Sequence, residues 1–259
     1  MNVLLIGDIT GSPGREAVKA LVPGLKKKEK IDFVIANAEN AAGGSGVTPE
    51  TCSELLDAGV NVLTSGDHIW KQKQVLEIIG TEKRLLRPGN YPEGAPGSGA
   101  GLYVAGDFLV GVINVQGRVF MDHIDCPFKA AMRYATELSK KTKIILVDVH
   151  AEATSEKIAI GWYLDGLVSC VFGTHTHVQT ADDKILPKGT AYITDLGMTG
   201  PFDSVIGRRK EQILERFITR MPVKFQVADS DVRLNGAIVD VDEKTGKARS
   251  IKRVQIGKD

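Results

Sequence analysis

The sequence is poor in cysteine, and its three cysteines, Cys52, Cys126 and Cys170, lie far apart without a CxxC pair. This odd and sparse set suits neither a disulfide framework nor a zinc finger, and it favours a reducing, cytoplasmic location. The chain also lacks an excess of either charge, because 33 Lys and Arg stand against 32 Asp and Glu. Broad binding to duplex DNA needs clustered Lys and Arg, so the balance argues against that class of protein.

Long apolar runs are absent as well. The first run, Val3–Ile6, has no basic residue before it and ends at Asp8, so it predicts a buried strand and not a signal peptide. The most apolar later stretch, Leu102–Val115, is interrupted by Asp107 and by glycines, which argues against a membrane span. Hydrophobic residues still make up 42% of the chain, enough to offset the entropy of folding. We expect a single domain over residues 1–259.

Short apolar runs alternate with amphipathic patterns along the chain. The predicted strands are Val3–Ile6, Phe33–Ala36, Val60–Thr64, Tyr103–Val104, Phe108–Val115, Lys143–Val149, Val168–Phe172, Val223–Val227, Leu234–Val241 and Ile251–Ile256. The predicted helices are Pro13–Lys28 with Ser12 as its cap, Pro49–Ala58, Trp70–Ile79, Phe128–Lys140 and Ser155–Leu164. This order predicts an α/β fold in which two mixed sheets pack together and helices flank them.

Residue types that bind metal ions follow five of the predicted strands. In chain order they are Asp8, then Glu39 and Asn40, then Asp67 and His68, then His150, and finally His175 and His177. Ligands bind at the carboxyl ends of strands in open α/β sheets, so these side chains are expected at one edge. Only His123, among the five histidines, lies outside this set. A lone histidine is more often structural, but four of five at strand ends indicate a shared site.

The mixture of carboxylate, amide and imidazole groups indicates the metal. Such ligands suit Mn, Fe or Zn and do not suit a soft thiolate site. Seven ligand groups are too many for one ion and fit two, and Glu39 can bridge both. Two ions about 3.5–4 Å apart activate a water and hold the oxygens of a phosphoryl transfer. One further histidine can then donate a proton to the leaving oxygen.

The order of these motifs resembles that of the calcineurin-like metallophosphoesterases. The longer segments Gly7–Arg15, Glu39–Ala42, His150–Lys157, Gly173–Asp182 and Thr194–Pro201 resemble the bacterial YmdB-type branch of that superfamily. The resemblance covers nearly the whole chain. It implies a four-layer αββα sandwich, a dinuclear centre that contains iron, with manganese or zinc as alternatives, and hydrolysis of 2′,3′-cyclic nucleotides or related phosphodiesters.

Carried over by position, the resemblance also implies a role for each residue. Asp8, Asn40 and His177 bind the first metal, Glu39 bridges, Asp67, His150 and His175 bind the second, and His68 is the general acid. In the implied mechanism a metal-bridging hydroxide attacks phosphorus. One position departs from the family, which has Asn where this chain has Asp67. With two divalent ions, three carboxylates and one hydroxide the centre has no net charge. We hypothesise that Asp67 favours ferric iron or weakens phosphate binding.

Several residues keep two interpretations at this point. Asp148 and Asp195 either support a ligand histidine or are buried acids paired with a base. Arg87 and Arg118 either bind phosphate or form salt bridges that anchor loops. The segment Gly43–Val47 lacks the last glycine of a GxSxG motif, and it predicts a mobile loop near the site that can touch substrate.

Two other functions remain as alternatives. A dinucleotide-binding oxidoreductase is suggested by Gly7, Gly11 and Gly14, but their spacing is not GxGxxG and Asp8 would repel a pyrophosphate. A non-catalytic, metal-binding regulatory protein is the second, because ligands alone do not prove turnover. For the preferred function we expect a small nucleotide or an RNA-end phosphodiester as substrate, no membrane partner, and a homo-oligomer.

Overall fold

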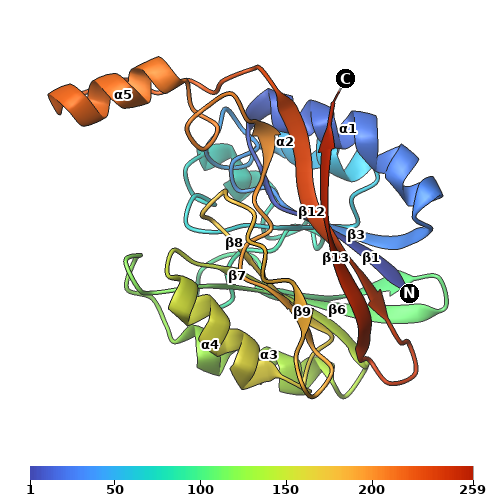
Figure 1. The fold of residues 1–259 in the computed structure, drawn as a ribbon. Helices are drawn as coiled ribbons and strands as arrows, with labels where there is room; N and C mark the ends of the chain where they lie inside the picture. Colours follow the sequence, from blue (N-terminus) through green and yellow to red (C-terminus); the bar gives the residue numbers. More distant parts are fainter. Residues whose placement is uncertain (259) are drawn as a thin grey trace.

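The computed structural model describes residues 1–258, and position 259, the last of the expected domain, lies outside the described residues. Two β-sheets pack face to face in it (Figure 1). In the first sheet the order is β2-β11-β12-β1-β3-β4, and β13 pairs with β12. Its strands are β1 (Asn2–Ile6), β2 (Asp8–Ile9), β3 (Ile31–Asn37), β4 (Val62–Thr64), β11 (Met198–Pro201), β12 (Val232–Val241) and β13 (Ala248–Gly257).

The second sheet has the order β5-β6-β7-β8-β10-β9. Its strands are β5 (Ala100–Ala105), β6 (Phe108–Gln116), β7 (Ile144–His150), β8 (Cys170–Thr174), β9 (Lys184–Ile185) and β10 (Ala191–Ile193). The strands β5 and β6 form an antiparallel hairpin, whereas β6, β7, β8 and β10 run parallel. Both sheets are therefore mixed, as the sequence predicts.

Helices cover the outer face of each sheet (Figure 1). α1 (Gly11–Lys28) and α2 (Pro49–Asp57) cover the first sheet, and α3 (Pro127–Leu138) and α4 (Thr154–Leu164) cover the second. The chain also contains α5 (Lys210–Thr219) and a short 3-10 helix, η1 (Lys73–Glu77). Neighbouring residues of one strand serve different layers: Leu4 packs with α1 and α2, and Leu5 packs between the two sheets. A third apolar layer joins the second sheet to α3 and α4. The four-layer αββα architecture is thus confirmed.

Strand direction sets the position of the strand-end residues. β1, β3 and β4 are parallel, with Ile6 opposite Ala36 and Ala36 opposite Leu63. In the second sheet Gln116 and Thr174 lie on either side of His150. The carboxyl ends of these strands meet at one edge of the sandwich, so the loops that follow them lie together.

Three predictions differ from the structure. The first helix begins at Gly11 with Thr10 at its N-cap position, so Ser12 lies inside the helix and is not its cap. The expected helix over residues 70–79 is replaced by turns and by η1, in which the backbone N–H of Ile78 bonds to the carbonyl of Val75. Tight i→i+3 turns suit a segment whose buried side chains, Ile69, Val75 and Ile79, must all face one core. The predicted strand over Val223–Val227 is irregular, because only Val227 forms a bridge, to Arg208.

The sequence prediction missed the short strands β2, β9, β10 and β11. It also missed the helix α5. Its apolar residues Ile213, Leu214, Phe217 and Ile218 recur at helical spacing, but only Ile213 is buried. The helix projects from the body of the molecule (Figure 1). Among residues 1–258, none of the helices combines the length and hydropathy that a bilayer crossing requires.

Candidate metal centre

The structure brings the predicted site residues to one place between the carboxyl ends of the two sheets. Asp8 lies in β2, and His150 is the last residue of β7. The others lie directly beyond strands: Glu39 and Asn40 after β3, Asp67 and His68 after β4, His175 and His177 after β8. A cavity of about 310 Å³ is lined by five of them, Glu39, Asn40, His68, His175 and His177. His123, the histidine left out of the prediction, is exposed on the surface.

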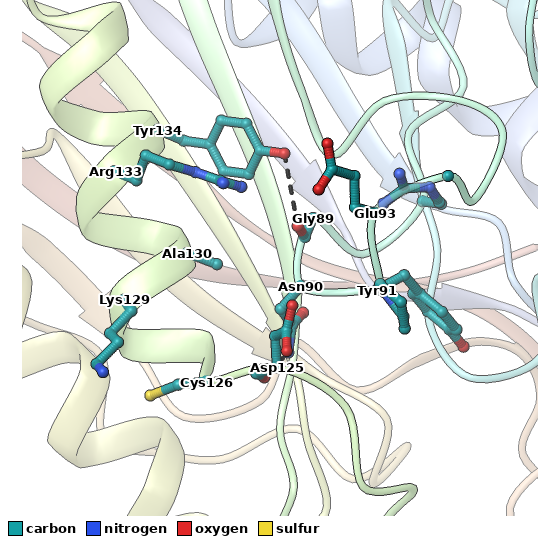
Figure 2. A pocket seen from close by; sticks show the side chains of 13 residues that line it. Gly89, Asn90, Tyr91, Glu93, Asp125, Cys126, Lys129, Ala130, Arg133 and Tyr134 are labelled. Atoms are coloured by element: carbon teal, nitrogen blue, oxygen red, sulfur yellow. Dashed lines mark hydrogen bonds between the residues drawn. The ribbon is translucent and has the colours of Figure 1, made fainter.

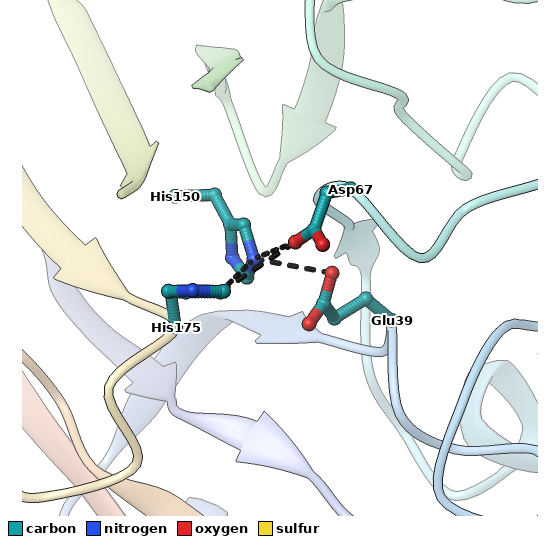
Figure 3. Close-up of side chains that lie close together, drawn as sticks. All are labelled: Glu39, Asp67, His150 and His175. Atoms are coloured by element: carbon teal, nitrogen blue, oxygen red, sulfur yellow. Dashed lines mark hydrogen bonds and ion pairs between the residues drawn. The ribbon is translucent and has the colours of Figure 1, made fainter. Parts of the chain in front are cut away.

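Four of these side chains form a compact group. One ligand atom from each of Glu39, Asp67, His150 and His175 lies within 4.8 Å of the other three (Figure 3). The Nε2 atom of His150 is central, at 3.1 Å from Glu39 Oε2 and 3.2 Å from Asp67 Oδ1. It is also 2.9 Å from His175 Nδ1. Converging carboxylate oxygens and imidazole nitrogens are the donor set of a transition-metal site.

Asp8, Asn40 and His177 form a second group beside the first. His177 Nε2 lies 3.2 Å from Asn40 Nδ2 and 3.9 Å from Asp8 Oδ1. Asp8 Oδ1 is buried and has no hydrogen-bond partner among residues 1–258. A buried carboxylate oxygen without a donor is costly unless a cation balances it. The Asn40 amide presents its nitrogen to His177 Nε2 and its oxygen to His68 Nδ1, so it lies between the two rings.

The outer nitrogens of two histidines are held by neighbours. His177 Nδ1 lies 3.0 Å from the carbonyl of Ile206, which can only accept a hydrogen bond, so Nδ1 carries the proton and Nε2 is the nitrogen left free for a ligand. His150 Nδ1 lies 2.9 Å from Thr174 Oγ1, which donates to Asp148 Oδ1 at 2.8 Å. Asp148 therefore supports His150 through a hydroxyl group, and it has no basic partner among the described ion pairs. Of the two interpretations of Asp148, support of a histidine and pairing with a base, the contacts favour the first.

Local backbone conformation also serves the centre. Gly66 lies against the ring of His150, and an added Cβ would come within 2.0 Å of its Cδ2 atom. His175 and His177 both have positive φ angles, 97° and 64°, which non-glycine residues rarely adopt. Such conformations cost of order 1–3 kcal/mol each and persist only where the surroundings impose them.

A buried ion pair imposes the conformation of this histidine loop. Asp195 Oδ2 lies 2.6 Å from Lys157 Nζ, and both side chains are buried. The same oxygen accepts hydrogen bonds from the backbone N–H and the hydroxyl of Thr176, the residue between His175 and His177. Asp195 is thus both paired with a base and in contact with the loop that carries two predicted ligands.

The pKa values of the acids and histidines at the centre indicate negative charge that a cation would balance. Burial raises the pKa of Asp8 to about 6, although the nearby His177 and His150 lower it. Burial also raises the pKa of Glu39, but the charge and hydrogen bond of His150 outweigh this effect and hold it at about 2. Burial lowers the pKa of His150, yet the surrounding carboxylates, Glu39 first, raise it well above its usual value. Burial and the charge of His150 lower the pKa of His175 to about 4.

These observations test whether the residues present fit a metal ion. Glu39 and Asp67 face the protonated ring of His150. Asp8 Oδ1, which has no hydrogen-bond donor, lies 3.9 Å from His177 Nε2 and 4.0 Å from His150 Nδ1. Divalent cations at these points would replace the protonated ring as the source of positive charge. The residues therefore fit a metal centre.

A larger cavity, of about 680 Å³, contains none of the predicted ligands (Figure 2). Arg87 lines it, but its guanidinium group donates to the carbonyls of Pro88, Ala95 and Pro96. These bonds favour the interpretation of Arg87 as a loop anchor. Arg118 is exposed, and its backbone N–H, not its side chain, binds the buried carboxylate of Glu156.

Several residues at the metal centre were missed in the sequence. Arg208, Ile206 and Glu152 line the same cavity as His68 and His177. Glu152 Oε2 lies 3.2 Å from His175 Nε2. Glu152 follows β7 by two residues, so its position after His150 was a usable signal. Arg208 and Ile206 follow no strand end of the predicted pattern, and nothing local in the sequence distinguishes them.

Known proteins resemble this chain in both sequence and fold. A family model described as "YmdB-like protein" matches residues 4–254. The chain is 49% identical to the 2′,3′-cyclic-nucleotide 2′-phosphodiesterase of Bacillus subtilis over 100% of this chain and 98% of the relative. It superposes with a TM-score of 0.94 on a hypothetical protein of Thermus thermophilus, 41% identical, with full coverage of both chains. A "novel phosphatase" of Mycoplasma pneumoniae also gives 0.94, at 36% identity, over 100% of this chain and 94% of that one.

Proposed function

The chain belongs to the YmdB-like family, and on that premise we propose that it is a metal-dependent phosphodiesterase that hydrolyses 2′,3′-cyclic nucleotides or related phosphodiesters. The observation that carries the proposal is the convergence of Glu39, Asp67, His150 and His175 within 4.8 Å. The activity named for the Bacillus subtilis relative, which matches over the full length of this chain, supports the substrate class.

We propose a dinuclear centre. Asp8, Asn40 and His177 hold the first ion, Asp67, His150 and His175 hold the second, and Glu39 bridges. The two groups of side chains support this division, because Glu39 lies between them: Oε2 is near His150, and Oε1 accepts from Asn40 Nδ2 at 3.0 Å. Iron fits the oxygen and nitrogen ligands, as manganese or zinc would. When bound, the ions supply an activated water and stabilise charge on the phosphoryl oxygens.

His68 is the proposed general acid. Its Nδ1 atom lies 2.9 Å from Asn40 Oδ1, and its backbone N–H donates to Glu39 Oε2 at 3.2 Å. An amide oxygen only accepts, so Nδ1 carries a proton and orients the ring. When the ring is protonated at both nitrogens, Nε2 gives its proton to the departing ribose oxygen, and the ring is left neutral with its proton on Nδ1. His68 is partly exposed at the cavity, whereas His150 is fully buried, so His68 has the access that a proton donor needs.

The remaining expectations are proposals of the same kind. We propose that residues 1–259 act as one domain in the cytoplasm, for which the three unpaired cysteines give support. We propose a homo-oligomer, because the apolar residues Leu214, Phe217 and Ile218 of α5 are all more than half exposed. The substrate is a small nucleotide or an RNA end, not duplex DNA or a membrane.

The test is purification without oxygen, metal analysis, and assay against a panel of cyclic and linear phosphodiesters. We expect about two metal ions per chain and turnover that is lost with a chelator and restored by Fe or Mn. Hydrolysis of 2′,3′-cyclic nucleotides should exceed that of linear diesters. Bound metal with no turnover of any diester would instead indicate a non-catalytic regulatory protein. Binding of a nicotinamide without a transition metal would indicate an oxidoreductase.

A further inference from the structure

We propose that Arg208 is a substrate-binding residue whose guanidinium group binds the non-bridging oxygens of the phosphodiester at the metal centre. This inference rests on the proposed function and deepens it. It concerns a side chain 31 positions beyond the last predicted ligand, His177, on the turn between β11 and α5.

The position and charge of Arg208 support this role. It lines the cavity onto which His68 and His177 open, and in the described part of the chain no other Lys or Arg lines that cavity. None of the ion pairs found within residues 1–258 involves Arg208, so no carboxylate neutralises it there. Burial lowers the pKa of its guanidinium group. A partly desolvated, unpaired arginine beside a hydrolytic site is suited to an anionic ligand.

The guanidinium group is held in place by backbone, not by acids. Its Nη2 donates to the carbonyl of Gly44, and its Nη1 lies 3.5 Å from the carbonyl of Gly43. Two of the five N–H groups are used in this way, which leaves three for a ligand. Gly44 has a φ of +86°, and an added Cβ would come within 2.6 Å of Arg208 Nη1. A side chain at this position would therefore displace the guanidinium group from where it lies.

The same contacts fix Arg208 relative to the metal centre. The carbonyl of Ile206, two residues before it, binds His177 Nδ1. On the other side, the backbone N–H of Gly46 bonds to the carbonyl of Glu39 at 2.5 Å. Both segments that position the guanidinium group are therefore tied to predicted metal ligands. A preorganised donor of this kind binds phosphate without first losing conformational entropy.

Charge explains why the chain needs such a residue. With Asp8, Glu39 and Asp67 ionised, a centre of two divalent ions and one hydroxide has no net charge, and a phosphodiester carries one negative charge. Arg208 supplies the missing positive charge. Its planar fork also matches two phosphoryl oxygens, which a point charge does not.

The experiment compares Arg208→Met with Arg209→Met. Arg209 is the adjacent arginine, half exposed and paired with Asp229 on the surface, so it controls for the loss of one positive charge. We measure KM and kcat for 2′,3′-cyclic AMP and for bis-p-nitrophenyl phosphate, inhibition by inorganic phosphate, metal content and Tm. Arg208→Met should raise KM and the phosphate inhibition constant about tenfold to a hundredfold, with metal content retained. Arg209→Met should leave all of these unchanged.

Two further variants separate binding from loop anchoring. Arg208→Lys keeps the charge without the fork and should fall between wild type and Arg208→Met. Gly44→Ala keeps the arginine but displaces it, and it should weaken phosphate inhibition as Arg208→Met does. Unchanged KM and phosphate inhibition in Arg208→Met, or loss of its metal, would overturn the proposal. If the wild type hydrolyses neither diester, the proposed function fails, and calorimetry with inorganic phosphate still decides whether Arg208 binds the anion.

Discussion

The Nε2 atom of His150 lies 2.9 Å from the Nδ1 atom of His175, and the two rings cross at 77°. At this distance the two ring nitrogens share a proton or a cation, because two lone pairs would repel each other. Carboxylates from two other loops face the same nitrogen of His150. His150 is the last residue of β7 and His175 follows β8, so both rings are attached to the second sheet. The pair therefore links metal binding to the packing of that sheet.

The first prediction concerns the ion that these two rings would share. His175→Ala should lower the metal content from about two ions per chain to about one, because it removes one of three terminal ligands. His123→Ala is the matched control, since His123 is exposed and outside the centre, and it should keep both ions. Metal analysis of the two purified variants measures this. Equal metal content in the two variants would show that His175 is not a ligand.

The second prediction concerns proton donation by His68. His68→Ala should lower kcat for 2′,3′-cyclic AMP by about 10²- to 10⁴-fold and should retain the metal. With bis-p-nitrophenyl phosphate the loss should be much smaller, because p-nitrophenolate leaves without a proton. Steady-state kinetics on both substrates measures the contrast. The same loss on both substrates would assign His68 to another task.

The third prediction concerns Asp67, whose Oδ1 atom lies 3.2 Å from His150 Nε2. Asp67→Asn removes one negative charge from the centre and keeps an oxygen ligand. It should strengthen inhibition by inorganic phosphate roughly tenfold and should lower the share of ferric iron in the purified protein. Inhibition kinetics and metal analysis with redox speciation measure both effects. Unchanged values for both would remove the hypothesis that this carboxylate tunes the centre.

The fourth prediction concerns the buried pair of Lys157 and Asp195. Lys157→Met leaves the Asp195 carboxylate buried and unpaired, which should cost about 3–5 kcal/mol of unfolding free energy. The double variant Lys157→Met/Asp195→Asn should recover part of this loss, since neither side chain is then charged. Urea unfolding of the single and double variants gives the comparison. A double variant no more stable than Lys157→Met would show that the missing charge balance is not the cause.

The fifth prediction concerns Asp8 in the metal-free protein. Its pKa is about 6 in the folded protein and about 3.9 in an unfolded chain, so folding favours the protonated form. The penalty for ionised Asp8 is absent below pH 4, grows between pH 4 and 6, and reaches about 3 kcal/mol above pH 6. Asp8→Asn should therefore stabilise the metal-free protein above pH 6 and have little effect at pH 4.

Urea unfolding with a chelator present measures the difference between Asp8→Asn and wild type at several pH values. With excess metal the order should reverse, because wild type gains stability from bound ions and the variant binds them poorly. A stability difference that does not change with pH would contradict the raised pKa of Asp8.

Most of the fold followed from local patterns. Leu4 and Leu5 alternate between two apolar layers, and such alternation is visible in a strand of any sequence. The helix α5 was visible too, since Leu214 and Ile218 have helical spacing, but a helix that buries only Ile213 has little core to signal it. The prediction of a helix over residues 70–79 was wrong although its apolar residues are buried. Turns and η1 place the same side chains in the core without an α-helix.

The sequence by itself determined which chemical groups end which strands, because the point at which a strand ends is set by the local residue pattern. It could therefore nominate Asp8, Glu39 and His150 for one edge of the sheets. Only the tertiary structure decided which nitrogen of His150 faces the centre, that Asp195 holds Thr176, and that Arg208 reaches the cavity beside Gly44. Arg208 and Gly44 are 164 positions apart, and contacts over such separations arise from the packing of whole layers, which no local pattern encodes.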